Sequence, residues 1–234
     1  MLWMKAWLET RWRLLYTLAI PLAALALPHI IGGGATSQKA ADKATHTFMG
    51  VMAFFSLFGA AYLAGAGIKS QSPFAAMKGL EGSMYYTLAL PVSRLRLILV
   101  RAGVGLMEFG GVSAVVYSAF WLFSPARGSS TPFDLLKLIL AAVASMACFY
   151  FIAVLLATFL DDPWPTFGGM FATIVVWFVI SRISPPPSIN LFGFAGDASP
   201  LITHTLPWPA MGISLIASAI LLWAALKIAE PRDY

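Results

Sequence analysis

Six long apolar segments divide this chain, and they constrain its fold more than any other feature. Of its 234 residues, 59% are hydrophobic and 11% are charged, whereas a soluble domain carries roughly a quarter charged residues. A helix needs about 20 apolar residues to cross a bilayer, and closed barrels give a much weaker alternating pattern. We therefore predict an all-α integral membrane protein, residues 1–234 forming a single domain with six transmembrane helices. The segments run from about Leu14 to Ile31, Phe48 to Ile68, Leu97 to Phe123, Leu135 to Leu160, Phe167 to Ile183 and Trp208 to Ala229.

The residues outside these segments are too few for a motor domain. Six spans take about 120 residues and leave about 110 for all loops and tails, less than a second catalytic domain of ordinary size needs. We expect no catalytic residues on this chain. The net charge is +5, but the basic residues form no stripe or tract, so we expect no nucleic-acid partner.

The placement of Lys and Arg predicts the orientation of the chain. With both termini in the cytoplasm, ten basic residues lie inside and five outside, as the positive-inside rule requires. We therefore predict a multi-pass plasma-membrane protein with cytoplasmic N- and C-termini. The inner set is Lys5, Arg11, Arg13, Lys69, Lys78, Arg94, Arg96, Arg101, Lys227 and Arg232, and the outer set is Lys39, Lys43, Arg127, Lys137 and Arg182.

Residues 1–13 have the pattern of an amphipathic helix. At helical spacing Lys5, Glu9 and Arg13 share one face, and tryptophans lie on the other, which is typical of a helix in the membrane interface. The alternative is an ordinary basic flank with a tryptophan anchor. The candidate interfacial residues are Trp3, Trp7, Glu9 and Arg11.

The predicted inner loop, residues 69–96, is too long for a turn and too apolar for a solvated linker. A short helix from about Phe74 to Leu90 would present a hydrophobic edge to a partner. Pro91 breaks that helix, and Ser93 is placed to cap the next one.

The same loop carries a family resemblance. Glu81-Gly82-Ser83, Leu88, Leu90-Pro91-Val92-Ser93-Arg94, Ile98-Leu99 and Arg101 resemble the signature of type-2 membrane permeases of ATP-binding cassette (ABC) transporters. Ser199-Pro200-Leu201-Ile202-Thr203-His204, before the sixth segment, is similar to a second motif of that family.

The resemblance implies a permease subunit, an exporter of a lipid, amphipathic drug or peptide, in a bacterial inner membrane. Two permease copies, identical or different, would each seat a cytoplasmic ATPase chain that holds ATP and Mg. It also implies that residues 184–207 form a re-entrant cap over the outer end of the pathway; a loop resting on the outer interface is the alternative. The implied ATPase-docking residues are Met77, Lys78, Gly79, Leu80, Glu81, Gly82, Ser83 and Met84.

Glu108 is the ionisable residue deepest in a predicted span, about 16 Å along the third helix. A charge at that depth is costly, so the side chain should face the bundle interior, be protonated or pair. A place in the substrate path, a structural hydrogen bond and a shallower, water-accessible position remain open. Arg101 lies on the same face, too far along for a direct pair without bending.

Two other function classes are alternatives. A secondary transporter driven by ions or protons would use Glu108 as its coupling group. A membrane-embedded lipid-modifying enzyme would need His, Asp or Arg clusters at one membrane face, and the predicted inner loops contain no histidine. We expect no metal site, because His29, His46 and His204 lack short ligand spacing.

Small residues four apart predict faces where helices pack closely. The pairs are Ala61 with Gly65, Gly110 with Ala114, and Gly168 with Ala172.

Overall fold

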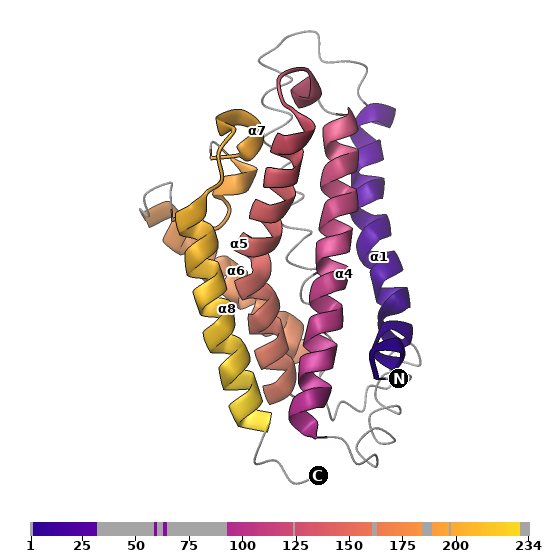
Figure 1. The fold of residues 1–234 in the computed structure, drawn as a ribbon, viewed down its shortest axis with the longest axis vertical. Coiled ribbons are helices and arrows are strands. Elements are labelled where there is room, and N and C mark those ends of the chain that lie inside the picture. The colour runs from indigo at the N-terminus through magenta and orange to yellow at the C-terminus, as the bar shows by residue number, and fades with distance from the viewer. Residues whose placement is uncertain are drawn as a thin grey trace.

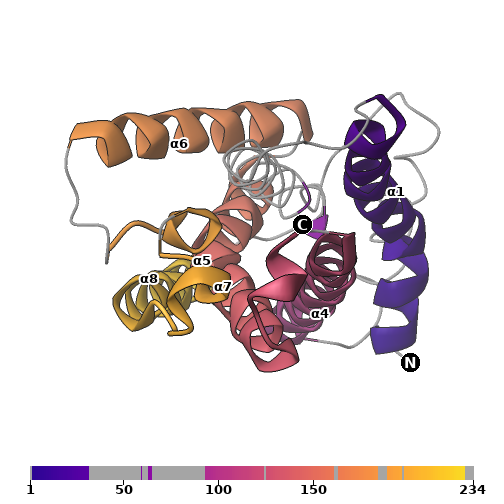
Figure 2. The same ribbon diagram turned by 90° about the horizontal axis from the view of Figure 1, so that it is seen from above.

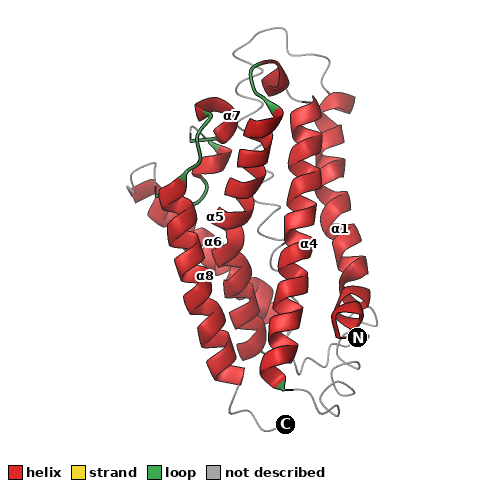
Figure 3. Cartoon of the chain, in the orientation of Figure 1, coloured by secondary structure: helices red, strands yellow, loops and turns green. Residues whose placement is uncertain are grey.

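The computed structural model describes residues 2–31, 59, 63–64, 93–123, 125–160, 163–183, 189–196 and 198–229. Every secondary-structure element in these residues is a helix (Figure 3), which confirms the all-α prediction for the described part of the chain. The elements are α1 (Leu2–Ile31), α4 (Arg94–Phe123), η1 (Pro125–Gly128), α5 (Pro132–Phe159), α6 (Pro163–Ile183), η2 (Gly193–Ala195), α7 (Pro200–Thr203) and α8 (Trp208–Ala229).

Three described helices are long and apolar enough to cross a membrane. They are Ile98–Phe123, Pro132–Thr158 and Trp208–Ile228, which coincide with the third, fourth and sixth predicted segments. Two further apolar stretches, Arg13–Ala23 in α1 and Gly168–Trp177 in α6, are the runs of these helices over which side chains are described. Of the second predicted segment only Gly59, Leu63 and Ala64 are described. The structure thus supports a membrane protein and half of the predicted spans.

The long helices form a bundle whose two ends differ. In Figure 1, α1, α4, α5 and α8 run along the long axis, and Figure 2 shows α6 lying across the others. We call the end where α4 begins and α8 finishes the foot, and the end where α5 begins and α7 lies the head. The first turns of α1 also lie at the foot (Figure 1).

Helix α5 is the centre of the core. It packs against α4, α6, α7 and α8, and Leu138, Ala142, Met146 and Tyr150 on it are almost completely buried. By contrast α8 leaves large apolar side chains such as Trp223 exposed, as a helix that faces lipid does. The core therefore lies along α5, with the outer faces of its neighbours available to the bilayer.

Two buried serines fix the distance between α5 and α8. The hydroxyl of Ser214 in α8 donates to the main-chain oxygen of Ser145 in α5 at 3.0 Å and accepts from the amide of Cys148 at 3.2 Å. Ser145 and Ser214 are fully buried. Small side chains that bond to main-chain groups allow two helices to approach closely within a membrane.

Local sequence signals set where several helices begin. The Ser93 hydroxyl accepts from the Arg96 amide at 3.4 Å as α4 starts, which confirms the predicted cap. Ser199 caps α7 with Pro200 in its first turn. Thr131 and Asp134 form a reciprocal capping box at the start of α5, where each side chain accepts from the other residue's amide.

Two of the predicted small-residue pairs pack less closely than predicted, and the third, Ala61 with Gly65, lies outside the described residues. A Cβ atom built on Gly110 or on Gly168 would meet no heavy atom within 4 Å among the described residues. Close approaches occur instead at Gly59, Gly103, Gly105 and Gly169, which the spacing pattern did not single out. Spacing identifies small residues but not the direction in which a neighbouring helix lies.

Candidate functional site

The predicted ATPase-docking surface falls outside the described residues. This holds for all eight residues from Met77 to Met84 and for the loop 69–96 up to Val92. The described residues begin again at Ser93, and α4 starts at the next residue, Arg94. The structure therefore shows the helix that the loop leads into.

The predicted interfacial residues form the first turns of α1, which continues to Ile31 as one helix. Trp3 and Trp7 are each 50% exposed, and Arg11 is exposed; the side chain of Glu9 lies outside the described part. Figures 1 and 2 show these turns bending across the foot, out of line with the rest of α1. The Trp3 indole lies over α4, since a Cβ on Gly103 would stand 3.2 Å from its Cη2 atom.

Arg13 differs from the prediction for this segment. It was assigned to the polar face, yet it is 6% exposed and lies inside the bundle. Its main-chain oxygen accepts from the Thr17 hydroxyl at 2.7 Å. Helical spacing placed Arg13 with Lys5 and Glu9, but the bend in α1 turns this part of the helix toward the core.

Glu108 lies in the interior of the bundle, as its position in the third segment predicted. It is 6% exposed on α4, and Arg101, on the same helix, is half-buried. Both charges lie within electrostatic range of the Tyr150 hydroxyl of α5. That hydroxyl donates to the main-chain oxygen of Ala102 at 2.9 Å. A polar centre thus joins α4 to α5 inside the bundle.

Gly105 makes room for this centre. A Cβ atom at residue 105 would stand 2.8 Å from the main-chain oxygen of Leu63 and would overlap the Tyr150 hydroxyl. Leu63, α4 and α5 therefore meet at one point. Sequence reasoning missed Tyr150, although a tyrosine in an apolar segment needs a partner for its hydroxyl and could have been singled out for that reason.

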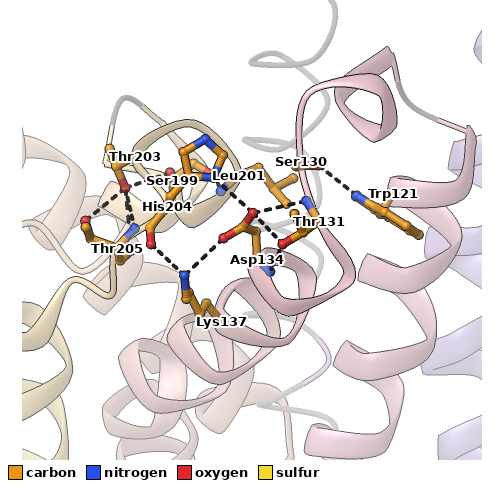
Figure 4. Close-up of polar contacts among 10 residues, drawn as sticks. All are labelled: Trp121, Ser130, Thr131, Asp134, Lys137, Ser199, Leu201, Thr203, His204 and Thr205. Atoms are coloured by element: carbon orange, nitrogen blue, oxygen red, sulfur yellow. Dashed lines mark hydrogen bonds and ion pairs between the residues drawn. The ribbon is translucent and has the colours of Figure 1, made fainter.

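A second polar cluster lies at the head, and Figure 4 shows its members. Asp134 is 4% exposed and accepts from Lys137 Nζ at 3.0 Å, and the Nδ1 atom of His204 lies 2.9 Å from its other carboxylate oxygen. The Lys137 ammonium also donates to the main-chain oxygen of His204 at 2.6 Å. We call Asp134, Lys137 and His204 the His204 clamp. It ties the segment between α7 and α8 to the first turn of α5.

Apolar side chains from the residues before His204 enter the bundle. Leu191, Phe194 and Leu201 are buried. The Phe194 ring meets Tyr117 of α4 edge-on at 6.2 Å between centroids. Residues 189–207 are described except Asp197, and we call these described residues the cap. The cap packs against α5 at the head, and Phe194 reaches Tyr117 of α4. The predicted cap, residues 184–207, thus has short helices and a buried apolar face over its described part.

Comparison with protein-family models, with curated proteins and with solved structures finds no match to this chain. Among the described residues, no three His, Cys, Asp or Glu side chains are grouped closely enough to hold a metal ion.

The polar groups described above hold helices and the cap in position relative to one another. The Tyr150 hydroxyl, the Ser214 hydroxyl and the His204 clamp each join one helix or cap segment to the main chain or carboxylate of another. In an apolar environment such contacts decide which helix arrangements are permitted, because a polar group left without a partner there is costly.

Proposed function

We propose that this chain is the membrane permease subunit of a type-2 ABC transporter, and that it exports a lipid, amphipathic drug or peptide. The observation that carries the proposal is the loop signature ending in Leu90-Pro91-Val92-Ser93-Arg94 and its direct entry into α4. Ser93 caps that helix, which begins at Arg94, the last residue of the signature. A movement of the loop would be transmitted along α4, as one rigid helix, to the polar centre at Glu108.

The arrangement of the ends of the chain supports the proposed orientation. The first turns of α1 and the last turn of α8 share the foot (Figure 1). Arg11, Arg96 and Lys227 are exposed there, which favours a cytoplasmic foot by the positive-inside rule. The docking loop would then face the cytoplasm, where ATP is available, and the cap would face outward.

Glu108 is the proposed substrate-path residue. It is buried, and both it and Arg101 act electrostatically on the Tyr150 hydroxyl. An amphipathic substrate has an apolar part and a polar part, and a polar centre between helices can contact the polar part. ATP and Mg would be held by the separate ATPase, and a second permease copy would complete the transporter.

Affinity purification from native membranes in mild detergent tests this proposal. We expect an ATPase of separate sequence to co-purify with the tagged chain, and Glu81→Lys in the docking loop to remove it. Asp42→Lys, in a predicted outer loop, is the matched control and should retain it. A chain that purifies without an ATPase, with transport intact after ATP depletion, would contradict the proposal.

A secondary transporter is the second candidate, because the buried Glu108 is the kind of group that couples ion movement to transport. Dissipating the proton gradient at constant ATP separates the two. Transport by an ABC permease should persist, whereas transport by a proton-coupled carrier should stop.

A further inference from the structure

Two glycines thin α4 at one level of the bundle. Gly103 and Gly105 are two residues apart, which is about 200° around a helix, so they lie on nearly opposite faces of α4. Helix α4 lies between α1 and α5 and contacts both (Figures 1 and 2). We call the turn from Ala102 to Gly105 the waist of α4. One glycine of the waist meets α1, and the other meets α5.

An aromatic side chain fills the space beside each glycine. A Cβ atom on Gly103 would stand 3.2 Å from Cη2 and 3.5 Å from Cζ3 of Trp3, two atoms of the six-membered ring of the indole. A Cβ atom on Gly105 would overlap the Tyr150 hydroxyl, which donates to the Ala102 oxygen in the same turn. Trp3 and Tyr150 therefore support the waist from opposite sides.

The waist needs this support because glycine weakens a helix. Each glycine lowers helix propensity relative to alanine by a factor of about five, and helices bend most readily where such residues lie together. The waist begins about 12 Å from the start of α4 at Arg94, and Glu108 follows it along the helix. A bend at the waist would therefore separate the end of α4 that the loop enters from the part that carries Glu108.

We propose that Trp3 is a positioning residue that prevents α4 from bending at the waist, so that movement of the loop before Ser93 reaches Glu108. The tasks of the loop and of Glu108 rest on the proposed function, whereas the support of the waist is a property of this chain alone. The Trp3 indole is half-exposed and reaches α4 from the first turns of α1, which bend across the foot (Figure 1). These turns thus support α4 in addition to the interfacial role predicted from the sequence.

Hydrogen–deuterium exchange of the purified full-length chain measures this support. Trp3→Ala removes the ring, and we expect exchange in peptides covering residues 102–109 to rise about fivefold, the helix cost of one unsupported glycine. Met4→Ala is the matched control, because Met4 is the next residue and is 66% exposed, and methionine and alanine have similar helix propensities. It should leave exchange at the waist unchanged relative to a reference peptide inside α8.

The double variant Trp3→Ala with Gly103→Ala decides the mechanism. With the ring absent the new methyl group has room, and alanine restores helix propensity, so exchange should return to within about twofold of the wild type. In the wild-type background the same methyl group must displace the Trp3 ring, so Gly103→Ala should add much less protection there. A tryptophan that only anchors α1 in the membrane interface would give no such dependence. Equal effects of Gly103→Ala in the two backgrounds, or unchanged exchange in Trp3→Ala, would overturn the proposal.

The ratio of substrate moved to ATP hydrolysed tests the consequence for transport. Trp3→Ala should retain the co-purifying ATPase but lower this ratio about two- to fivefold, and adding Gly103→Ala should restore it. An unchanged ratio in Trp3→Ala would contradict the transmission of movement through the waist. Absence of any ATPase would contradict the proposed function instead, and the exchange measurements would still decide whether Trp3 supports α4.

Discussion

Replacing Gly105 by alanine should separate α4 from α5 at the polar centre. The new Cβ atom would stand 2.8 Å from the Leu63 oxygen, a main-chain atom that cannot rotate away, and would overlap the Tyr150 hydroxyl. Overpacking of this kind costs about 1–3 kcal/mol, and displacing the Tyr150 hydroxyl from the Ala102 oxygen costs about 1 kcal/mol more. Alanine returns about 1 kcal/mol of helix propensity. We therefore expect a net loss of about 1–3 kcal/mol.

Gly110 on the same helix is the matched control. A Cβ atom there meets nothing within 4 Å among the described residues, so Gly110→Ala should be neutral or stabilising by up to about 1 kcal/mol. Thermal unfolding in detergent measures both variants, at roughly 2–4 °C per kcal/mol for a chain of this size.

The double variant Gly105→Ala with Tyr150→Phe assigns the cause. Removing the hydroxyl relieves one of the two clashes and leaves the Leu63 oxygen, so the double variant should be less destabilised than the two single changes added together. If Gly105→Ala unfolds at the same temperature as Gly110→Ala, then α4 and α5 do not meet closely at Gly105 and the reasoning fails.

Three further substitutions test other parts of the structure. Thr131→Ala removes the capping box of α5 and should cost about 1 kcal/mol in thermal unfolding; an unchanged unfolding temperature would show that the box contributes nothing. Phe194→Ala empties a buried site in the cap and should cost about 3–5 kcal/mol and expose the cap to protease, whereas Ile202→Ala, at a 53% exposed position, should be near neutral; equal effects would contradict the burial of the cap. Glu108→Gln keeps the size of the side chain and should lower transport while expression stays normal; unchanged transport would leave Glu108 a structural residue.

The features predicted from sequence were those that depend on local pattern. The third, fourth and sixth spans follow from the length and apolar character of their segments, and the cap at Ser93 follows from one residue type before a helix start. The burial of Glu108 follows from the cost of a charge at that depth.

The contacts that build the sites could not be predicted because they join residues far apart in the chain. Tyr150 and Ala102 are 48 positions apart, and His204 and Asp134 are 70 apart. The capping box of Thr131 and Asp134 follows a local sequence pattern, but nothing in the sequence indicates that the Asp134 carboxylate also contacts the His204 ring. Arg13 shows the same limit, because the bend of α1 decides whether its side chain meets water or the core.

Two helix contacts along α5, the α5–α8 seam and the α4–α5 seam, differ in the length of the side chains that make their hydrogen bonds. At the α5–α8 seam a serine hydroxyl, one bond from its Cβ atom, bridges Ser145 and Cys148, so sliding the helices by even part of a turn breaks both contacts. At the α4–α5 seam the hydroxyl stands at the end of the long Tyr150 side chain and bonds to one main-chain oxygen of α4. Further oxygens follow along the helix at about 1.5 Å of rise per residue, and rotation of the side chain can follow a small shift of α4. If an ATPase moves α4 through the loop before Ser93, movement at the α4–α5 seam breaks fewer contacts than movement at the α5–α8 seam. In that case α5, α8 and the cap move as a unit.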